Sequence, residues 1–155
     1  MFFFDEEPKI SEKEIQILYQ THPYLIERGF LNQKIVPQYS LPSGFADIVV
    51  FLENEIVIIE LKVGILENEH LLQLYGYLED IMQKFKNIEK IRGILIGQKP
   101  VKDLYMMVDN FSFGIKILVL NTDITTKVKI CNKCRLANDL KNMNCVFCHS
   151  DIFLV

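Results

Sequence analysis

Three charged residues interrupt two strongly apolar stretches in the first half of the chain. Asp47 lies in GFADIVVFL, and Glu60 and Lys62 lie in EIVIIELKV. If Glu53 and Asn54 form a two-residue hairpin loop, Asp47 lies directly opposite Glu60 in the strand pair, and Lys62 projects on the same face one step further. A three-residue loop without a bulge would shift this register, so the predicted pairing depends on the length of the loop.

Two carboxylates that face each other across a strand pair repel and destabilise the sheet unless something compensates. A divalent cation such as Mg²⁺ or Mn²⁺ compensates well, because hard oxygen ligands that converge on one point are what these ions prefer. A structural salt bridge from Lys62 is the alternative, although an ion triad in so apolar a strand pair usually loses to hydrophobic residues of similar size. The spacing favours a metal site and leaves the structural triad open.

A second candidate metal site lies near the C-terminus, in CNKCRLANDLKNMNCVFC. Its two Cys-x₂-Cys pairs, Cys131 with Cys134 and Cys145 with Cys148, fit a tetrahedral zinc site. A rubredoxin-like iron site and two disulfides are the alternatives, and a reducing cytoplasm disfavours the disulfides. A segment this short builds no core of its own, so the ion would supply its folding energy. Such a cysteine-rich segment around one zinc ion, a zinc ribbon, has three candidate roles: it would bind nucleic acid, bind a partner protein, or brace the last strand.

Length and composition limit the fold. The chain has 155 residues, of which 50% are hydrophobic, enough for one core and a small appendage. No apolar run reaches the roughly eighteen residues of a membrane span, and MFFFDEEP lacks a basic start, so we expect a soluble cytoplasmic protein with no membrane partner. The net charge of -3 argues against a protein that coats nucleic acid, although five basic residues oppose two acidic ones from Lys127 onward.

The elements that must position these residues follow from periodicity and punctuation. Ser11 predicts a helix N-cap, with Glu14 as its capping-box partner and Ile10 packed on Ile15. PYLIER predicts a second short helix that Gly29 ends. Further elements are expected as an edge strand at 33–41, strands at 46–52 and 56–62, a long helix at 67–85, a buried strand at 92–97, a helix at 101–111 and a last strand at 115–120. This order predicts an α/β fold with a mixed sheet flanked by helices over 1–126, followed by a zinc-ribbon tail over 127–155.

The motifs in order resemble a known nuclease core. Gly44-Phe45-Ala46-Asp47, a short hairpin, Glu60-Leu61-Lys62, and then Gln73 with Tyr77 one helical turn later resemble the core of the PD-(D/E)XK superfamily, whose fold is restriction-endonuclease-like. HPYLIERGF is similar to the Asn-Pro-Glu-Leu-Ile-Glu-Pro-Gly-Leu stretch of NucS-type endonucleases, and QLYGY fits the Gln-xxx-Tyr pattern of RecB-type domains. The likeness runs from about Ser11 to Leu120. Ala46 stands where the motif has proline.

The resemblance implies a metal-dependent nuclease that hydrolyses phosphodiester bonds of DNA. It implies that Asp47, Glu60 and the main-chain carbonyl of Leu61 hold Mg²⁺ or Mn²⁺. Glu27 would contribute directly or through water, Lys62 would orient the attacking water or stabilise negative charge, and Gln73 would position Lys62 or the substrate. Without the resemblance, Glu27 and Gln73 are ordinary exposed residues, and Tyr77 packs in the core. The N-terminal domain of NucS proteins has no counterpart in this chain, so their branched-DNA and mismatch specificities are not inferred.

Two further readings remain open. The alternative hypothesis to an active nuclease is a catalytically silent module on a nuclease-like scaffold, which binds nucleic acid or protein through the zinc ribbon. RNA is a second candidate substrate, because nothing in these residues reads a 2′-hydroxyl. We also expect a homodimer to be one arrangement of the enzyme, since a cut in both strands needs two active sites.

Overall fold

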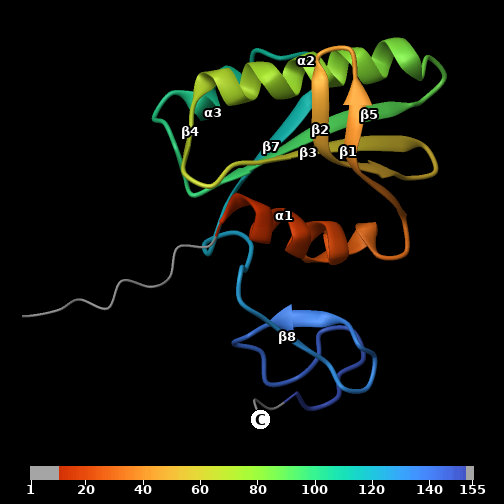
Figure 1. The fold of residues 1–155 in the computed structure, drawn as a ribbon, viewed down its shortest axis with the longest axis vertical. Helices are drawn as coiled ribbons and strands as arrows, with labels where there is room; N and C mark the ends of the chain where they lie inside the picture. Colours follow the sequence, from red (N-terminus) through yellow and green to blue (C-terminus); the bar gives the residue numbers. More distant parts are fainter. Residues whose placement is uncertain (1–10, 153–155) are drawn as a thin grey trace, which may run out of the picture.

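Five strands form one mixed sheet at the centre of the chain (Figure 1). The computed structural model describes residues 11–152, so Ile10 of the predicted staple and the MFFFDEEP stretch lie outside the described residues. The spatial order is β1-β2-β3-β5-β7, in which β1, β2 and β3 are antiparallel and β3, β5 and β7 are parallel. Their bounds are Lys34–Leu41, Gly44–Phe51, Glu55–Leu61, Lys90–Gly97 and Gly114–Val119. The predicted mixed sheet is confirmed, with the proline-containing strand at an edge.

Three α-helices accompany the sheet within residues 11–152. Helix α1 spans Glu12–Thr21, and the Ser11 hydroxyl accepts a hydrogen bond from the Glu14 N–H at 3.1 Å, as the capping motif predicted. Helix α2 spans Asn68–Lys84 and crosses over from β3 to β5, close to the predicted limits. The predicted helix over 101–111 is wrong in length, because only the five residues of α3, Leu104–Val108, are helical.

The predicted short helix in PYLIER is also wrong in type. The segment forms two separate 3₁₀ turns, η1 at Pro23–Leu25 and η2 at Arg28–Phe30. Glu27 lies between them in an extended conformation, with φ -144° and ψ 134°, which interrupts any continuous helix. Gly29 therefore lies inside the second turn and does not end a helix.

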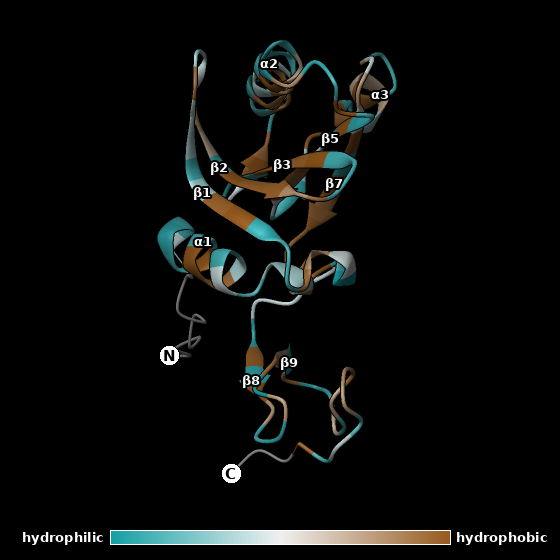
Figure 2. Cartoon of the chain, turned by 90° about the vertical axis from the view of Figure 1, so that its right-hand side faces the viewer, coloured by the Kyte–Doolittle hydropathy of each residue, from teal (hydrophilic) through white to brown (hydrophobic). Residues whose placement is uncertain are grey.

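The two faces of the sheet carry separate hydrophobic cores. Helix α2 packs on one face, over Val49, Ile56 and Ile58, and α1 packs on the other, over Ile48 and Ile59. Figure 2 shows the hydrophobic strands enclosed between α2 and α3 on one side and α1 on the other. Burial on both faces explains why β3 and β5 read as nearly continuous apolar runs in the sequence.

The C-terminal part of the chain has its own small sheet. Strands β8 (Val128–Ile130) and β9 (Ala137–Asp139) pair antiparallel beyond the end of β7 at Val119, on the α1 side of the molecule (Figure 1). A further short pair, β4 (Ile65–Leu66) with β6 (Lys99–Pro100), flanks the loops after β3 and β5. The division of the chain at residue 126 stays a prediction. Across the described residues, no helix has the length and apolar character that crossing a bilayer requires.

Candidate active site and metal centre

Asp47 and Glu60 meet where β2 and β3 separate. The hairpin loop has two residues, closed by a hydrogen bond of 2.8 Å from Leu52 N–H to the Glu55 carbonyl. Regular pairing ends at Ile48 opposite Ile59, and the next position in the same register is Asp47 opposite Glu60. Here side chains replace the backbone ladder: the Asp47 N–H donates to Glu60 Oε1 at 2.8 Å, and the Leu61 N–H donates to Asp47 Oδ2 at 2.8 Å. The two carboxylates lie in the fork between the strands.

The electrostatics of this pair are unfavourable without a cation or a proton. Glu60 is 2% exposed. Burial, and secondly the negative charge of Asp47, raise the pKa of Glu60 to about 8. A buried carboxyl group whose pKa is raised by a neighbouring carboxylate is typical of functional sites, where a bound cation can neutralise the pair.

The donor set fits a hard divalent cation. Asp47 Oδ1 has a long contact of 3.5 Å from Gln38 Nε2, and its Oδ2 accepts the Leu61 N–H. The N–H and C=O of one strand residue point to the same edge of the strand, so the carbonyl of Leu61 also faces the fork. Two carboxylates and a carbonyl are ligands that Mg²⁺ and Mn²⁺ accept, together with water.

Lys62 lies beside this pair without binding it directly. Its Nζ lies 4.0 Å from Glu12 Oε1 at the start of α1, and its side chain is 28% exposed. Its positive charge lowers the pKa of Glu60, although less than burial and Asp47 raise it. Among the described ion pairs, none joins Lys62 to either carboxylate, so the structure does not show the compact structural triad that was the alternative reading.

Gln73 and Tyr77 approach the site from α2. Gln73 is exposed and its Nε2 donates to Tyr77 Oη at 3.1 Å. The ring of Tyr77 is 2% exposed, as expected for core packing. Burial raises the pKa of Tyr77, and the negative charges of Glu60 and Asp47 add to this effect. Its hydroxyl also lies 3.0 Å from the point where a Cβ would stand on Gly44, which has φ +141°. Glycine lets the chain pass this ring closely just before Asp47.

The structure does not bring Glu27 to Asp47 and Glu60. Arg92 holds both Glu27 oxygens, with contacts of 2.8 and 2.6 Å from its two terminal nitrogens, and it also donates to Glu55 at 2.8 Å. This cluster packs on Phe30, on the α1 side and near the start of β3, whereas Glu60 lies near the strand's end. Arg92 lowers the pKa of Glu27 through these hydrogen bonds. The guanidinium group of Arg92 thus binds the carboxylate of Glu27, which the resemblance assigned to the metal site.

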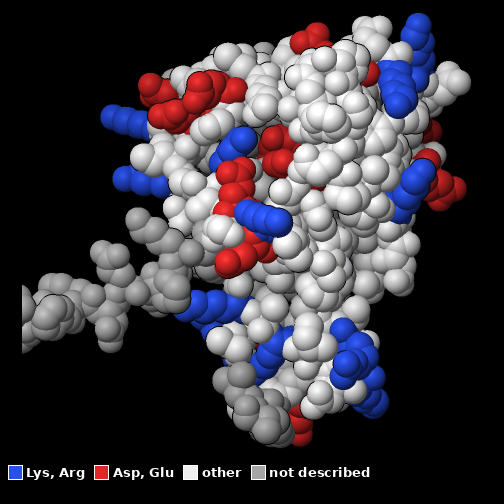
Figure 3. All heavy atoms as spheres, in the orientation of Figure 1, with Lys and Arg blue, Asp and Glu red and all other residues white. Residues whose placement is uncertain are grey.

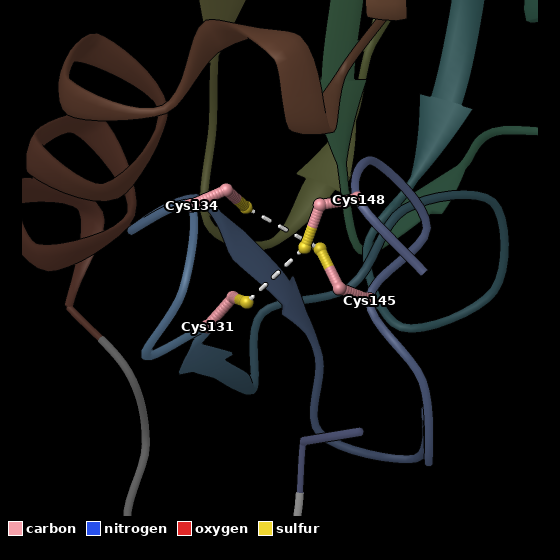
Figure 4. A group of neighbouring side chains, drawn as sticks. All are labelled: Cys131, Cys134, Cys145 and Cys148. Atoms are coloured by element: carbon pink, nitrogen blue, oxygen red, sulfur yellow. Dashed lines mark hydrogen bonds between the residues drawn. The ribbon is translucent and has the colours of Figure 1, made fainter. Parts of the chain in front are cut away.

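The four cysteines converge as the spacing predicted. Their sulfur atoms all lie within 4.8 Å of one another, with 3.7 Å between Cys131 and Cys148 and 3.5 Å between Cys134 and Cys145 (Figure 4). A zinc ion with bonds of about 2.3 Å to four thiolates places the sulfurs about 3.8 Å apart. Sulfurs in a disulfide are about 2 Å apart, so the cysteines are not paired as disulfides. The arrangement is consistent with a C-terminal zinc ribbon.

The cysteine-rich segment docks on the turns that follow α1. The Ala137 N–H donates to Tyr24 Oη at 2.7 Å, and Arg28 donates to the Val146 carbonyl at 2.9 Å. The Arg28 guanidinium also lies over the Phe147 ring, 5.3 Å from its centre. HPYLIERGF therefore contacts both the sheet, through Glu27, and the cysteine-rich segment.

Several contributing residues escaped the sequence analysis. His22 contacts Tyr24 Oη through Nδ1 at 2.7 Å, and burial lowers the pKa of His22, which favours the neutral ring. His70 Nδ1 accepts the Glu67 N–H at 2.9 Å and completes a capping box at the start of α2. The ion pairs of Arg92 could have been predicted most easily, because a charged residue at the start of the apolar stretch RGILIG needs a partner of opposite charge.

Comparisons with solved structures show a shared fold. A structure of an EndoMS–dsDNA complex matches with 22% identity and a TM-score of 0.59, covering 76% of this chain and 49% of that one. A repair endonuclease from Pyrococcus abyssi matches with 20% identity and a TM-score of 0.58, covering 74% and 49%. EndoMS in apo form matches with 22% identity and a TM-score of 0.55, covering 74% and 48%. The chain spans about half the length of these proteins.

The family comparison covers most of the sequence. A search among curated proteins found no match at the significance required. The family model for the Endonuclease NucS C-terminal domain matches residues 11–135, which include the strand fork, α2 and the first two cysteines. The chain belongs to the NucS C-terminal domain family.

Proposed function

We propose that this protein is a Mg²⁺-dependent nuclease that hydrolyses phosphodiester bonds of DNA. The observation that carries this proposal is the pairing of Asp47 with Glu60 in the fork between β2 and β3, where each carboxylate accepts a backbone N–H of the opposite strand. Backbone N–H groups of the two strands therefore hold both carboxylates in place. Family membership supports this chemistry over a purely structural role for the pair.

Asp47, Glu60 and the Leu61 carbonyl would hold Mg²⁺ or Mn²⁺. When bound, the ion lowers the pKa of a water molecule and neutralises charge on the scissile phosphate. Glu60 would bind the ion as a carboxylate, and the charge of the ion would offset the burial and the repulsion from Asp47 that raise the pKa of Glu60.

Lys62 would stabilise negative charge as it develops on the phosphate or orient the attacking water. Its Nζ is only loosely held, at 4.0 Å from Glu12 Oε1, so it is available to a substrate that enters beside the fork. Gln73 is exposed on α2 and would contact the substrate from the Tyr77 side. Glu27 would act on stability through Arg92 and would not bind the ion.

Two features support DNA as the substrate. The fold resembles that of EndoMS, which has been solved with dsDNA. Basic side chains predominate over the cysteine-rich end of the molecule, whereas acidic and basic side chains are mixed over the body on the same face (Figure 3). Lys133 and Arg135 of the first cysteine pair are exposed. We propose that a zinc-loaded ribbon assists binding of DNA or of a protein partner while the fork cuts.

The test is cleavage of labelled single-stranded, double-stranded and branched DNA, and of RNA, by zinc-replete protein with and without Mg²⁺ or Mn²⁺. Lys62→Ala should lose at least a hundredfold in rate while retaining the fold, as expected for an electrostatic group in the transition state. Lys86→Ala, at an exposed turn after α2, is the matched control and should cut normally.

Cleavage that persists in Lys62→Ala would point to a contaminating nuclease. Binding of DNA without cleavage by the unchanged protein would favour the catalytically silent scaffold. Faster cleavage of RNA than of every DNA substrate would change the substrate and keep the chemistry.

A further inference from the structure

Gln38 lies opposite Asp47 in the neighbouring strand pair. The pairs on either side, Pro37 with Ile48 and Tyr39 with Ala46, keep one register, which places Gln38 and Asp47 at the same rung. Gln38 has φ +49°. Of the five non-glycine residues with positive φ in residues 11–152, it is the one that lies inside a strand. The backbone of β1 is therefore forced into an unfavourable conformation beside the strand fork.

This conformation turns the β1–β2 hairpin. Side chains alternate along a strand, so residues 35, 39 and 41 would share one face of a regular strand. Ile35 instead packs in the core under α1, while Tyr39 and Leu41 pack in the core under α2. The end of the hairpin rises toward α2 (Figure 1), where the Ser43 N–H donates to Asp80 Oδ2 at 2.8 Å. Gln38 and Asp47 thus form the corner of the bend.

The side chain of Gln38 points at the oxygen of Asp47 that does not accept the N–H from β3. Its Nε2 lies 3.5 Å from Oδ1, while the Leu61 N–H holds Oδ2 at 2.8 Å. A contact of 3.5 Å is long for a hydrogen bond, and such contacts in catalytic sites tighten when the ligand arrives. Each carboxylate oxygen has two lone pairs, so Oδ1 can accept from an amide and still bind a cation.

A bend alone does not require glutamine. Glycine and asparagine adopt positive φ at lower cost and would turn the strand equally well. Gln38 is exposed at this strained position, and its amide is directed at Asp47. This indicates that the side chain interacts functionally with Asp47, in addition to any part that the residue has in the bend.

We propose that Gln38 is a positioning residue for Asp47: its amide holds Oδ1 in the orientation that binds the divalent cation. The inference rests on the proposed metal-dependent nuclease. Groups that hydrogen-bond to metal-ligating carboxylates typically change metal affinity or activity by about 10- to 100-fold when removed.

Gln38→Gly tests the side chain without disturbing the bend, because glycine accepts φ +49° without strain. We expect its Mn²⁺ affinity, measured by titration of zinc-replete protein, to fall about tenfold, with a similar loss in cleavage rate. Its unfolding temperature without Mn²⁺ should equal or exceed that of the unchanged protein. Gln38→Ala should lose the same Mn²⁺ affinity but unfold at a lower temperature than Gln38→Gly, since alanine keeps the backbone strain that glycine relieves.

Asn32→Gly is the matched control. Asn32 is exposed, has φ +63° and lies before β1, away from the fork, so its replacement should leave Mn²⁺ affinity unchanged. Equal Mn²⁺ affinity in Gln38→Gly and the unchanged protein would overturn the role of Gln38 and leave the nuclease standing. If the unchanged protein bound no Mn²⁺ outside the cysteine site, the proposed function and the inference would both fail.

Discussion

The ring of Tyr24 meets the ring of Phe147 edge to face, with centroids 5.3 Å apart. This contact joins the first 3₁₀ turn after α1 to the second cysteine pair. Because aromatic pairs of this geometry add to the stabilisation from burial alone, it helps to fix the cysteine-rich segment against the body of the molecule.

Replacing Tyr24 with phenylalanine should keep the ring contact and lose the hydroxyl. The Ala137 N–H, in a fully buried residue, would then lack its acceptor at 2.7 Å. An unsatisfied buried donor costs about 1–3 kcal/mol, so thermal unfolding should begin at a lower temperature. Tyr105→Phe is the control, since Tyr105 is 52% exposed. Equal unfolding curves for both variants would show that the hydroxyl contributes nothing.

Zinc removal should loosen the cysteine-rich segment. We expect elemental analysis to find one zinc per chain, and a strong chelator to lower the unfolding temperature, because the ion would join four side chains that otherwise have little core between them. Cys131→Ser should reproduce the effect. Met143→Ser, at an exposed position in the same segment, is the control. A red protein that contains iron would instead support the rubredoxin-like alternative.

Replacing Glu27 with glutamine should reduce stability in a pH-dependent manner. Arg92 lowers the pKa of Glu27 below its ordinary value of 4.5, so the charged contact stabilises the fold above that value and is lost as the pH falls through the lowered pKa. We expect a deficit of about 2 kcal/mol at pH 7 that shrinks toward pH 3.

Urea unfolding across this pH range measures the deficit, with Glu79→Gln on the exposed side of α2 as control. If Glu27→Gln lost Mn²⁺ binding at unchanged stability, Glu27 would belong to the metal site after all.

Replacing Glu60 with glutamine should increase the stability of the metal-free protein at high pH, whereas Glu27→Gln should reduce stability. The pKa of Glu60 is raised to about 8, so its stabilising contribution is present below its ordinary pKa of 4.5 and is lost as the pH rises through 8. Glu60→Gln should therefore unfold at a higher temperature than the unchanged protein at pH 9, and it should lose Mn²⁺ binding.

Glu53→Gln in the exposed hairpin loop is the control for this measurement. A gain of stability at pH 9 that equals the gain at pH 5 would contradict the raised pKa.

The sequence allowed the Asp47–Glu60 pairing to be predicted because the turn is short. A two-residue loop fixes the register of the whole hairpin, and the structure confirms that register up to Ile48 and Ile59. The convergence of the cysteines was predictable for a similar reason, since each Cys-x₂-Cys pair is a local unit.

The position of Glu27 could not be predicted in the same way. Its partner Arg92 lies 65 residues further along the chain, and only the parallel alignment of β3 with β5 brings Arg92 beside Glu55 and within reach of Glu27. The bend at Gln38 was equally hidden, because glutamine has no local preference for positive φ. In both cases tertiary contacts override what the local sequence favours.

Tyr24 and Glu27 lie three positions apart in the chain, and one is bound to the backbone of β9 while the other is bound to Arg92 on β5. The distance and orientation between the cysteine-rich segment and the sheet are consequently encoded in this one short stretch. Deleting Leu25 or Ile26, which lie between them and pack in the core under α1, would change the position of the cysteine-rich segment relative to the sheet and would also disturb that core. Changes of length at this point are therefore a route by which related chains can alter how far any surface on the cysteine-rich segment stands from the strand fork.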